Sequence, residues 1–135
     1  MKRKVNAIWK GDGNEGIGVL STQSGAISNM PYSFTTRFKN DDGKLGTNPE
    51  ELIAAALSGC FNMKLAFVLN ENGYNPDELA TDAELTFIDG VITQIEMNLN
   101  GKVPNLNQSS FEDYANEAKN NCPISRCRRG VVKKI

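Results

Sequence analysis

Two cysteines are the residues of this chain best suited to redox chemistry. Cys60 lies inside a long apolar run, in the stretch TNPEELIAAALSGC, and Cys122 stands directly before Pro123. A single cysteine in such a run most often serves as inert packing. Two thiols in separate, well-defined settings indicate instead a redox pair. In such a pair the second thiol closes a disulfide with the oxidised first one, before over-oxidation to sulfinic acid.

Arg37 and Glu50 are the residues that can activate the first thiol. Only a thiolate is a good nucleophile, so Cys60 needs a cation or hydrogen-bond donors to lower its pKa. Arg37 is sheltered by Phe34 and Phe38 in the stretch SFTTRF. Glu50 can hold the guanidinium in a bidentate pair. The ordinary alternatives are a surface cation for Arg37 and, for Glu50, an acid that complements the dipole of the first helical turn.

Cys122 has an activating setting of its own. It precedes Pro123 at a predicted helix start, where free backbone N–H groups and the helix dipole favour a thiolate. The alternative is an ordinary cap residue between a loop and a helix. Cys127 lies five residues further on, and we interpret it as incidental. The odd number of cysteines, three, argues against a disulfide framework and fits a reducing cytoplasm.

Composition excludes several classes of function. The 135 residues include no histidine, which excludes histidine-dependent triads, histidine general bases and histidine-containing zinc sites. A zinc-binding adaptor also lacks a CxxC pair. The net charge of −1 gives no electrostatic reason to expect nucleic acid or an anionic membrane as a partner. Chemistry on two thiols needs neither a metal nor an organic cofactor, and we expect none. The basic N-terminus is followed by polar residues, so no secretory signal is expected.

The length predicts a single domain over residues 1–135. We expect strands at 4–10, 16–22 and 33–38, which form an antiparallel meander. A long helix follows, with Asn48 as its N-cap, Pro49 at the first helical position and Glu51 completing a capping box. It ends near Gly73. Because this helix is apolar nearly all round, we expect it to be buried on all sides as a core helix.

The second half of the chain predicts a hairpin followed by helices. Strands at 82–88 and 91–99 flank the turn Asp89-Gly90, a strong hairpin signal. Ser109 and Glu112 predict a capping box for a helix that ends at 120–121. Cys122 then begins a short second helix, and residues 131–134 are predicted as an edge strand. This order of elements contains no βαβ unit, so the fold class is α+β.

Three motifs carry a family resemblance. The stretch TNPEELIAAALSGCF, with PYSFTTRF upstream and NCPISR downstream, resembles the osmotically inducible protein C (OsmC) and organic hydroperoxide resistance (Ohr) family. GVLSTQSG and PYSFTTRF favour the OsmC branch. The resemblance implies a thiol peroxidase that reduces organic hydroperoxides, with lesser use of hydrogen peroxide. It implies that Cys60 is the peroxidatic cysteine and Cys122 the resolving one, and that Arg37 and Glu50 match the family's arginine and acid.

The resemblance also implies an assembly and a reductant. The expected fold has antiparallel sheets wrapped around long central helices in an intertwined homodimer. The expected reductant is a dithiol, which in several members is a lipoylated protein, and we expect the protein in the cytoplasm. The departures from the family pattern include two single positions. Lys64 replaces a residue that is commonly apolar or small, and Cys127 is an extra thiol.

Apolar side chains near both candidate groups predict the substrate. The predicted pocket consists of Leu57, Phe61 and Met63 near Cys60, together with Phe34 and Phe38 beside Arg37. Burying an alkyl chain there contributes about 0.8 kcal/mol per CH₂, which hydrogen peroxide cannot supply. The rival interpretation is a non-catalytic module of the same fold that binds an apolar ligand such as a fatty acid.

Helix geometry predicts that the site is shared between two copies. Glu50 and Cys60 are ten residues apart on one predicted helix. That separation is about 15 Å along the axis, with the two side chains on different faces. Glu50 therefore reaches Cys60 of its own chain only through a break, for which Ser58-Gly59 is the candidate. Two antiparallel copies of the helix would instead bring each Glu50 to the partner's Cys60.

Overall fold

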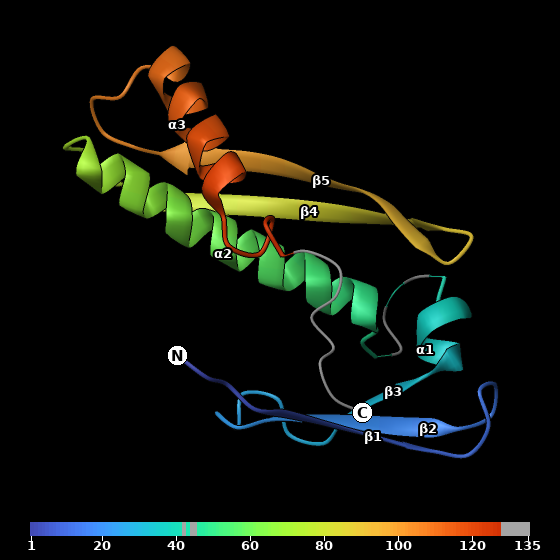
Figure 1. The fold of residues 1–135 in the computed structure, drawn as a ribbon. Coiled ribbons are helices and arrows are strands. Elements are labelled where there is room, and N and C mark those ends of the chain that lie inside the picture. Colours follow the sequence, from blue (N-terminus) through green and yellow to red (C-terminus); the bar gives the residue numbers. More distant parts are fainter. Residues whose placement is uncertain (42, 44–45, 128–135) are drawn as a thin grey trace. The chain divides into compact units, whose positions relative to one another are not determined.

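The computed structural model describes residues 1–41, 43 and 46–127. It confirms the predicted α+β class, with antiparallel strands and one long helix (Figure 1). The chain divides into two compact units, Met1–Leu52 and Ile53–Ile135, each described by itself below. The prediction of a single domain stays a prediction.

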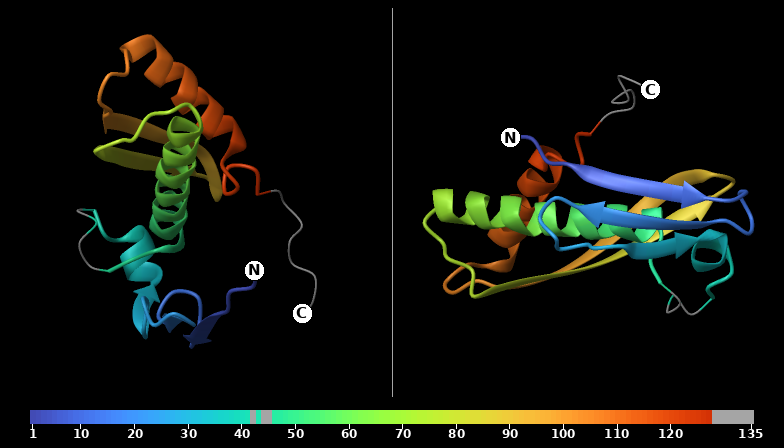
Figure 2. Two further views of the ribbon diagram at one scale, coloured as in Figure 1. Left: turned by 90° about the vertical axis from the view of Figure 1, so that its left-hand side faces the viewer. Right: turned by 90° about the horizontal axis from the view of Figure 1, so that it is seen from below.

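The first unit contains a three-stranded antiparallel sheet. Its strands lie side by side in the order β1 (Val5–Lys10), β2 (Ile17–Thr22) and β3 (Met30–Ser33), as Figure 2 shows from below. Gly18 pairs with Trp9 on one side and with Tyr32 on the other. A β-carbon at Gly18 would lie 2.4 Å from a ring carbon of Tyr32. Glycine therefore lets the rings of Trp9 and Tyr32 approach to 5.4 Å between centroids.

The strand predicted at 33–38 is wrong, because β3 ends at Ser33 and a short helix, α1 (Phe34–Phe38), follows. The Ser33 hydroxyl accepts a hydrogen bond from the N–H of Thr36, and the Thr36 hydroxyl oxygen accepts one from the N–H of Ser33. This reciprocal cap satisfies donors at the helix start and overrides the alternating pattern. The helical spacing then brings the Phe34 and Phe38 rings into a tilted contact, with centroids 4.9 Å apart.

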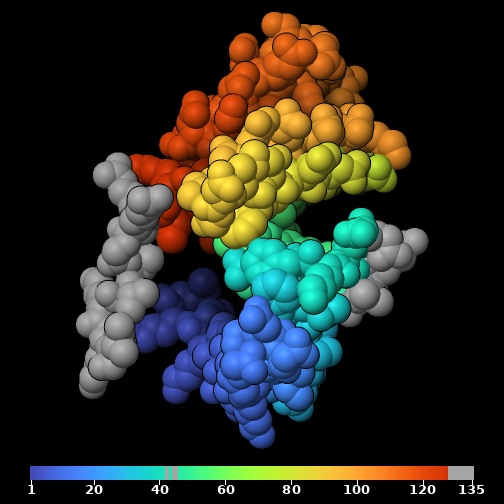
Figure 3. All heavy atoms as spheres, turned by 90° about the vertical axis from the view of Figure 1, so that its right-hand side faces the viewer, coloured from blue at the N-terminus to red at the C-terminus, as the bar shows by residue number. Residues whose placement is uncertain are grey.

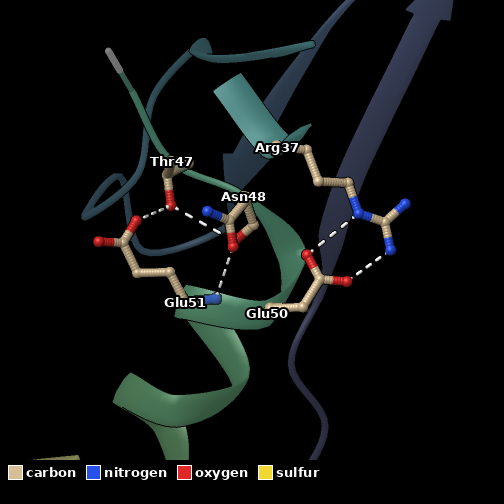
Figure 4. Close-up of polar contacts among 5 residues, drawn as sticks. All are labelled: Arg37, Thr47, Asn48, Glu50 and Glu51. Atoms are coloured by element: carbon tan, nitrogen blue, oxygen red, sulfur yellow. Dashed lines mark hydrogen bonds and ion pairs between the residues drawn. The ribbon is translucent and has the colours of Figure 1, made fainter. Parts of the chain in front are cut away.

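The long helix is α2 (Pro49–Glu71), and it begins and ends as predicted. Asn48 Oδ1 accepts a hydrogen bond of 2.8 Å from the N–H of Glu51. The second half of the predicted capping box is wrong, since the Glu51 carboxylate accepts from the Thr47 hydroxyl instead (Figure 4). The helix runs unbroken through Ser58-Gly59. Gly73 follows its end with a φ of 84°, as a C-terminal glycine should.

The expectation that α2 is buried on all sides is wrong for the single chain. Leu65, Val68 and Leu69 are fully buried, but Met63 and Phe67 are 65% and 57% exposed. By length and hydropathy alone α2 could cross a membrane, a test that the core helix of a soluble protein also passes. One side of α2 therefore packs within this chain, while an apolar side remains uncovered.

The second unit combines most of α2 with a long hairpin. Strands β4 (Glu78–Ile88) and β5 (Val91–Lys102) pair antiparallel and extend beyond both predicted strands. Asp89 and Gly90 have φ values of 50° and 78°, as the predicted hairpin turn requires. Asn62 of α2 donates from Nδ2 to the Leu79 carbonyl and accepts from the Thr81 hydroxyl. These two bonds fix the rotation of α2, and hence the direction of Cys60, relative to β4.

The second unit is closed by α3 (Gln108–Asn121). Its N-cap is Asn107, whose side chain accepts from the N–H of Ser110, so the predicted cap at Ser109 is wrong by two residues. Ala118 of α3 is fully buried against α2, in the core cluster that also receives side chains from β4 and β5. Figure 3 shows the yellow hairpin and the orange helix packed closely together.

The segment after α3 is a turn and not the predicted short helix. The N–H of Arg126 donates to the Cys122 carbonyl at 3.2 Å, and the N–H of Cys127 donates to the Ile124 carbonyl at 3.0 Å. These bonds close a turn over residues 123–126. The edge strand predicted at 131–134 lies outside the described residues.

Candidate active site

The structure brings the two predicted thiols together. Cys60 lies in the middle of α2, and Cys122 is the C-cap residue of α3. The segment after α3, red in Figure 1, returns to the middle of α2. There the two sulfurs lie 2.9 Å apart, joined by a hydrogen bond, and both thiols are free. A small movement would therefore bring them to disulfide distance. Cys127 is exposed.

The surroundings of the two sulfurs shift their pKa values in opposite directions. Burial acts to raise the pKa of Cys122, but hydrogen bonds from Cys60, from the N–H groups of Ser125 and Ile124 and from the Ser125 hydroxyl outweigh it, and its pKa is lowered. The pKa of Cys60 is raised, first by burial and then by its hydrogen bond to Cys122. Within this unit, these surroundings lower the pKa of Cys122 and raise the pKa of Cys60.

This coupling predicts the effect of removing the second thiol. In a Cys127→Ser background, Cys122→Ala should lower the pKa of Cys60, because it removes the charge and the hydrogen bond that raise it. The rate of Cys60 alkylation by iodoacetamide, followed by peptide mass spectrometry, should then rise at lower pH than in Cys127→Ser alone. An unmoved or upward-shifted midpoint would show that Cys122 does not oppose ionisation of Cys60.

Arg37 and Glu50 form the predicted bidentate pair. Arg37 Nε donates to one carboxylate oxygen of Glu50 at 3.0 Å and Nη2 donates to the other at 2.5 Å (Figure 4). The side chains are 35% and 14% exposed. The guanidinium carbon also lies 4.8 Å from the ring centroid of Phe38. Asn48 accepts from the N–H of Glu51 at the helix start, and the Thr47 hydroxyl donates to the Glu51 carboxylate. The Glu50 carboxylate takes no part in this cap and is available to orient Arg37.

A hollow of about 250 Å³ lies beside Arg37 in the first unit. The predicted Phe34 and Phe38 line it. Two further aromatic residues, Trp9 and Tyr32, also line the hollow and were not predicted. Trp9 and Tyr32 both pair with Gly18, one from each neighbouring strand. To predict that they lie side by side, one has to know the register of the sheet. The hollow therefore presents a cation surrounded by aromatic carbon.

The other predicted pocket residues do not share one surface of the single chain. Leu57 and Phe61 are buried, and Phe61 belongs to the core cluster. Phe61 also lines a groove of about 700 Å³ between β5 and α3. Met63 is exposed on the uncovered side of α2. Their role in binding substrate stays a prediction.

The candidate residues thus form two pairs, one in each unit. Arg37 and Glu50 belong to the first unit, and Cys60 and Cys122 to the second. Within the described residues, no group of three or more His, Cys, Asp or Glu side chains gathers around a possible metal position. The described residues therefore offer a dithiol, with an arginine held by a carboxylate as a separate group.

The second unit places a second thiol in contact with a cysteine in the middle of a long helix, an arrangement suited to the chemistry of thiol redox proteins. A family profile described as OsmC-like protein matches residues 40–133. The chain belongs to the OsmC family, which confirms the resemblance read from its motifs.

Relatives and solved structures agree with this assignment. The chain is 40% identical to Peroxiredoxin OsmC of Escherichia coli, over 96% of this chain and 92% of the relative. It is 31% identical to Organic hydroperoxide resistance protein-like 1 of Staphylococcus saprophyticus, over 68% of each chain. The crystal structure of the organic hydroperoxide resistance protein OhrB of Bacillus subtilis superposes with a TM-score of 0.65 at 26% identity, covering 97% and 93% of the two chains.

Proposed function

We propose that this protein reduces organic hydroperoxides to alcohols through a Cys60 sulfenic acid and a Cys60–Cys122 disulfide. The observation that carries the proposal is the approach of the two sulfurs to 2.9 Å. Membership of the OsmC family, with relatives named peroxiredoxin and organic hydroperoxide resistance protein, supports a thiol peroxidase activity. No metal or organic cofactor takes part in the proposed reaction.

The proposed reaction has three balanced steps. The Cys60 thiolate attacks the distal oxygen of the hydroperoxide, the O–O bond breaks, and the alkoxide takes up a proton and leaves as the alcohol. The Cys122 thiolate then attacks the sulfur of the Cys60 sulfenic acid, and hydroxide leaves as water after protonation. A dithiol reductant returns two electrons to the disulfide. A lipoylated protein as that reductant, and the cytoplasm as the location, stay predictions.

Arg37 has two roles in this proposal. Its guanidinium stabilises the Cys60 thiolate, and it donates to the peroxide oxygen on which charge develops. Glu50 holds it in one orientation through the bidentate contact. We propose that this arginine and carboxylate come from the partner copy in a homodimer, so that each active site is completed by two chains.

The aromatic hollow beside Arg37 supports a preference for bulky peroxides. We expect kcat/KM for cumene hydroperoxide to exceed that for hydrogen peroxide by about tenfold or more, since burying two CH₂ equivalents already gives that factor. Steady-state kinetics with dithiothreitol as reductant measures the ratio. Tyr32→Ser, which removes one wall of the hollow, should lower the ratio with little effect on hydrogen peroxide. Equal efficiency on both peroxides would contradict the preference for organic substrates.

A further inference from the structure

The two sulfurs of the thiol pair differ in accessibility. Cys122 is 0% exposed, whereas Cys60 is only partly buried. A thiolate that reduces a disulfide must reach one of its two sulfurs directly. The proposed peroxidase reaction already requires an opening at Cys60, since the hydroperoxide is attacked there. The same opening would admit a reducing thiolate to Cys60, and no equivalent approach to Cys122 exists within the described chain.

The hydrogen-bond donors are also distributed unequally. Pro123 has no N–H, and the turn closed by the bond from Arg126 to the Cys122 carbonyl directs the next two N–H groups back toward the Cys122 sulfur. The Ser125 hydroxyl is a third donor to that sulfur. Apart from the bond between the two thiols, the donor that acts on Cys60 is the N–H of Ile124. In thiol–disulfide exchange the sulfur whose thiolate is better stabilised is the better leaving group.

We propose, on the basis of the function proposed above, that the disulfide is reduced in one direction, with attack at Cys60 and Cys122 as the leaving group. One thiolate of a dithiol reductant bonds to the Cys60 sulfur, and the electron pair of the broken S–S bond goes to Cys122. The other thiol of the reductant loses its proton and attacks the reductant's own bound sulfur, which releases the Cys60 thiolate. The reductant is thereby oxidised to its disulfide, and both electrons reside on the protein thiols.

Ser125 is a positioning residue for this step, acting through Cys122. Its hydroxyl donates a hydrogen bond to the Cys122 sulfur and so stabilises the negative charge that develops there as the S–S bond breaks. Ser125 is exposed, so substitution there leaves no cavity in the core. The role differs from that of Arg37, which acts on the peroxide step, because it concerns only the reductive half of the cycle.

Trapping the mixed disulfide tests the direction. Cys127→Ser protein is oxidised with diamide rather than peroxide, treated briefly with cysteamine, and quenched with N-ethylmaleimide in denaturant. Peptide mass spectrometry should find cysteamine on Cys60 and N-ethylmaleimide on Cys122. Cysteamine mainly on Cys122, or equally on both, overturns the direction and leaves the peroxide chemistry untouched. Failure of diamide to form a Cys60–Cys122 disulfide overturns this proposal together with the resolving role of Cys122.

The role of Ser125 has its own test. Ser125→Ala should slow cleavage of the preformed disulfide by dithiothreitol roughly threefold to tenfold, and Ser125→Thr should restore the rate. In Cys60→Ser/Cys127→Ser protein, Ser125→Ala should also move the ultraviolet titration of the Cys122 thiolate to higher pH. Unchanged cleavage rate and unchanged titration remove Ser125 from the mechanism. Ser110→Ala, whose hydroxyl lies on α3 near its other end, is the matched control and should change neither.

Discussion

Replacing Cys60 by serine is expected to abolish turnover of cumene hydroperoxide. Cys122→Ser protein should still reduce a first equivalent of the hydroperoxide, but its Cys60 should then be open to over-oxidation. A hydroxyl is a far weaker nucleophile than a thiolate, so Cys60→Ser should lower kcat/KM by roughly a thousandfold or more. Cys122→Ser leaves the attacking sulfur in place. It removes only the thiol that lies 2.9 Å away and would trap the sulfenic acid.

The two variants are separated by consumption of peroxide without added reductant. Wild-type and Cys122→Ser protein should each consume about one equivalent at first, and Cys60→Ser none. With excess peroxide, mass spectrometry should find a Cys60–Cys122 disulfide in the wild type and Cys60 sulfinic acid in Cys122→Ser. Cys127→Ser is the control and should behave as wild type. A Cys60–Cys127 bridge that protects Cys122→Ser protein would transfer the resolving role to Cys127.

The same variant addresses the rival interpretation. A non-catalytic module that binds an apolar ligand would turn over no hydroperoxide, and Cys60→Ser would leave its affinity for a fatty acid intact. The rival interpretation places the ligand near Cys60, and Phe61, which follows Cys60, lines the groove of about 700 Å³ between β5 and α3. Its lining mixes apolar residues with Glu96, Glu112 and Lys119, which suits an extended alkyl chain poorly.

The candidate site was largely predictable because its residues lie at strong local signals. Asn48 and Pro49 determine where α2 begins, and this places Glu50 in the first turn, free to accept from Arg37. The pairing of Cys60 with Cys122, 62 residues apart, was predicted from their chemistry and the family motifs. The Ser125 hydroxyl was missed because only the closed turn brings it toward the Cys122 sulfur.

The errors in the fold have a common physical origin. At 33–38 an alternating pattern suggested a strand, but the reciprocal bonds of Ser33 and Thr36 favoured a helical turn. At the start of α3, the N-cap is Asn107 and not the predicted Ser109. In both cases hydrogen bonds between short polar side chains and nearby backbone groups determine where the helix begins. A hydrophobic pattern contains no information about these bonds. The exposure of Met63 and Phe67 was not foreseen for another reason, since an apolar pattern does not say which neighbour covers it.

The continuous helix α2 predicts that the active site is assembled from two chains. Because the helix continues through Ser58-Gly59, Glu50 remains about 15 Å from Cys60 along the axis of its own helix. If Glu50 of one copy lies opposite Cys60 of an antiparallel partner, the two helices cross at position 55, midway between them. Ala55, Ala56 and Gly59 are exposed there, and such small residues allow two helices to approach closely. The exposed Met63 and Phe67 would also be covered.

Co-expression of two damaged chains tests the shared site. Glu50→Ala and Cys60→Ser homodimers should both be impaired. In the mixed dimer, Cys60 of the first chain meets Glu50 of the second in one intact site, while the other site carries both lesions. About half of the wild-type activity should therefore return. Differently tagged chains allow the mixed dimer to be isolated before cumene hydroperoxide turnover is measured.

The bidentate contact supplies the control that makes this result specific. Arg37 and Glu50 pair within one chain, so a mixed dimer of Arg37→Ala with Glu50→Ala has one lesion in each shared site and should recover nothing. Arg37→Ala mixed with Cys60→Ser should instead recover about half, as Glu50→Ala does. Recovery in neither cysteine mixture, or full activity in a monomer, would defeat the shared site. Recovery in the mixture of Arg37→Ala with Glu50→Ala would show that Arg37 and Glu50 of one chain do not serve the same site, because otherwise each site of every dimer carries a lesion.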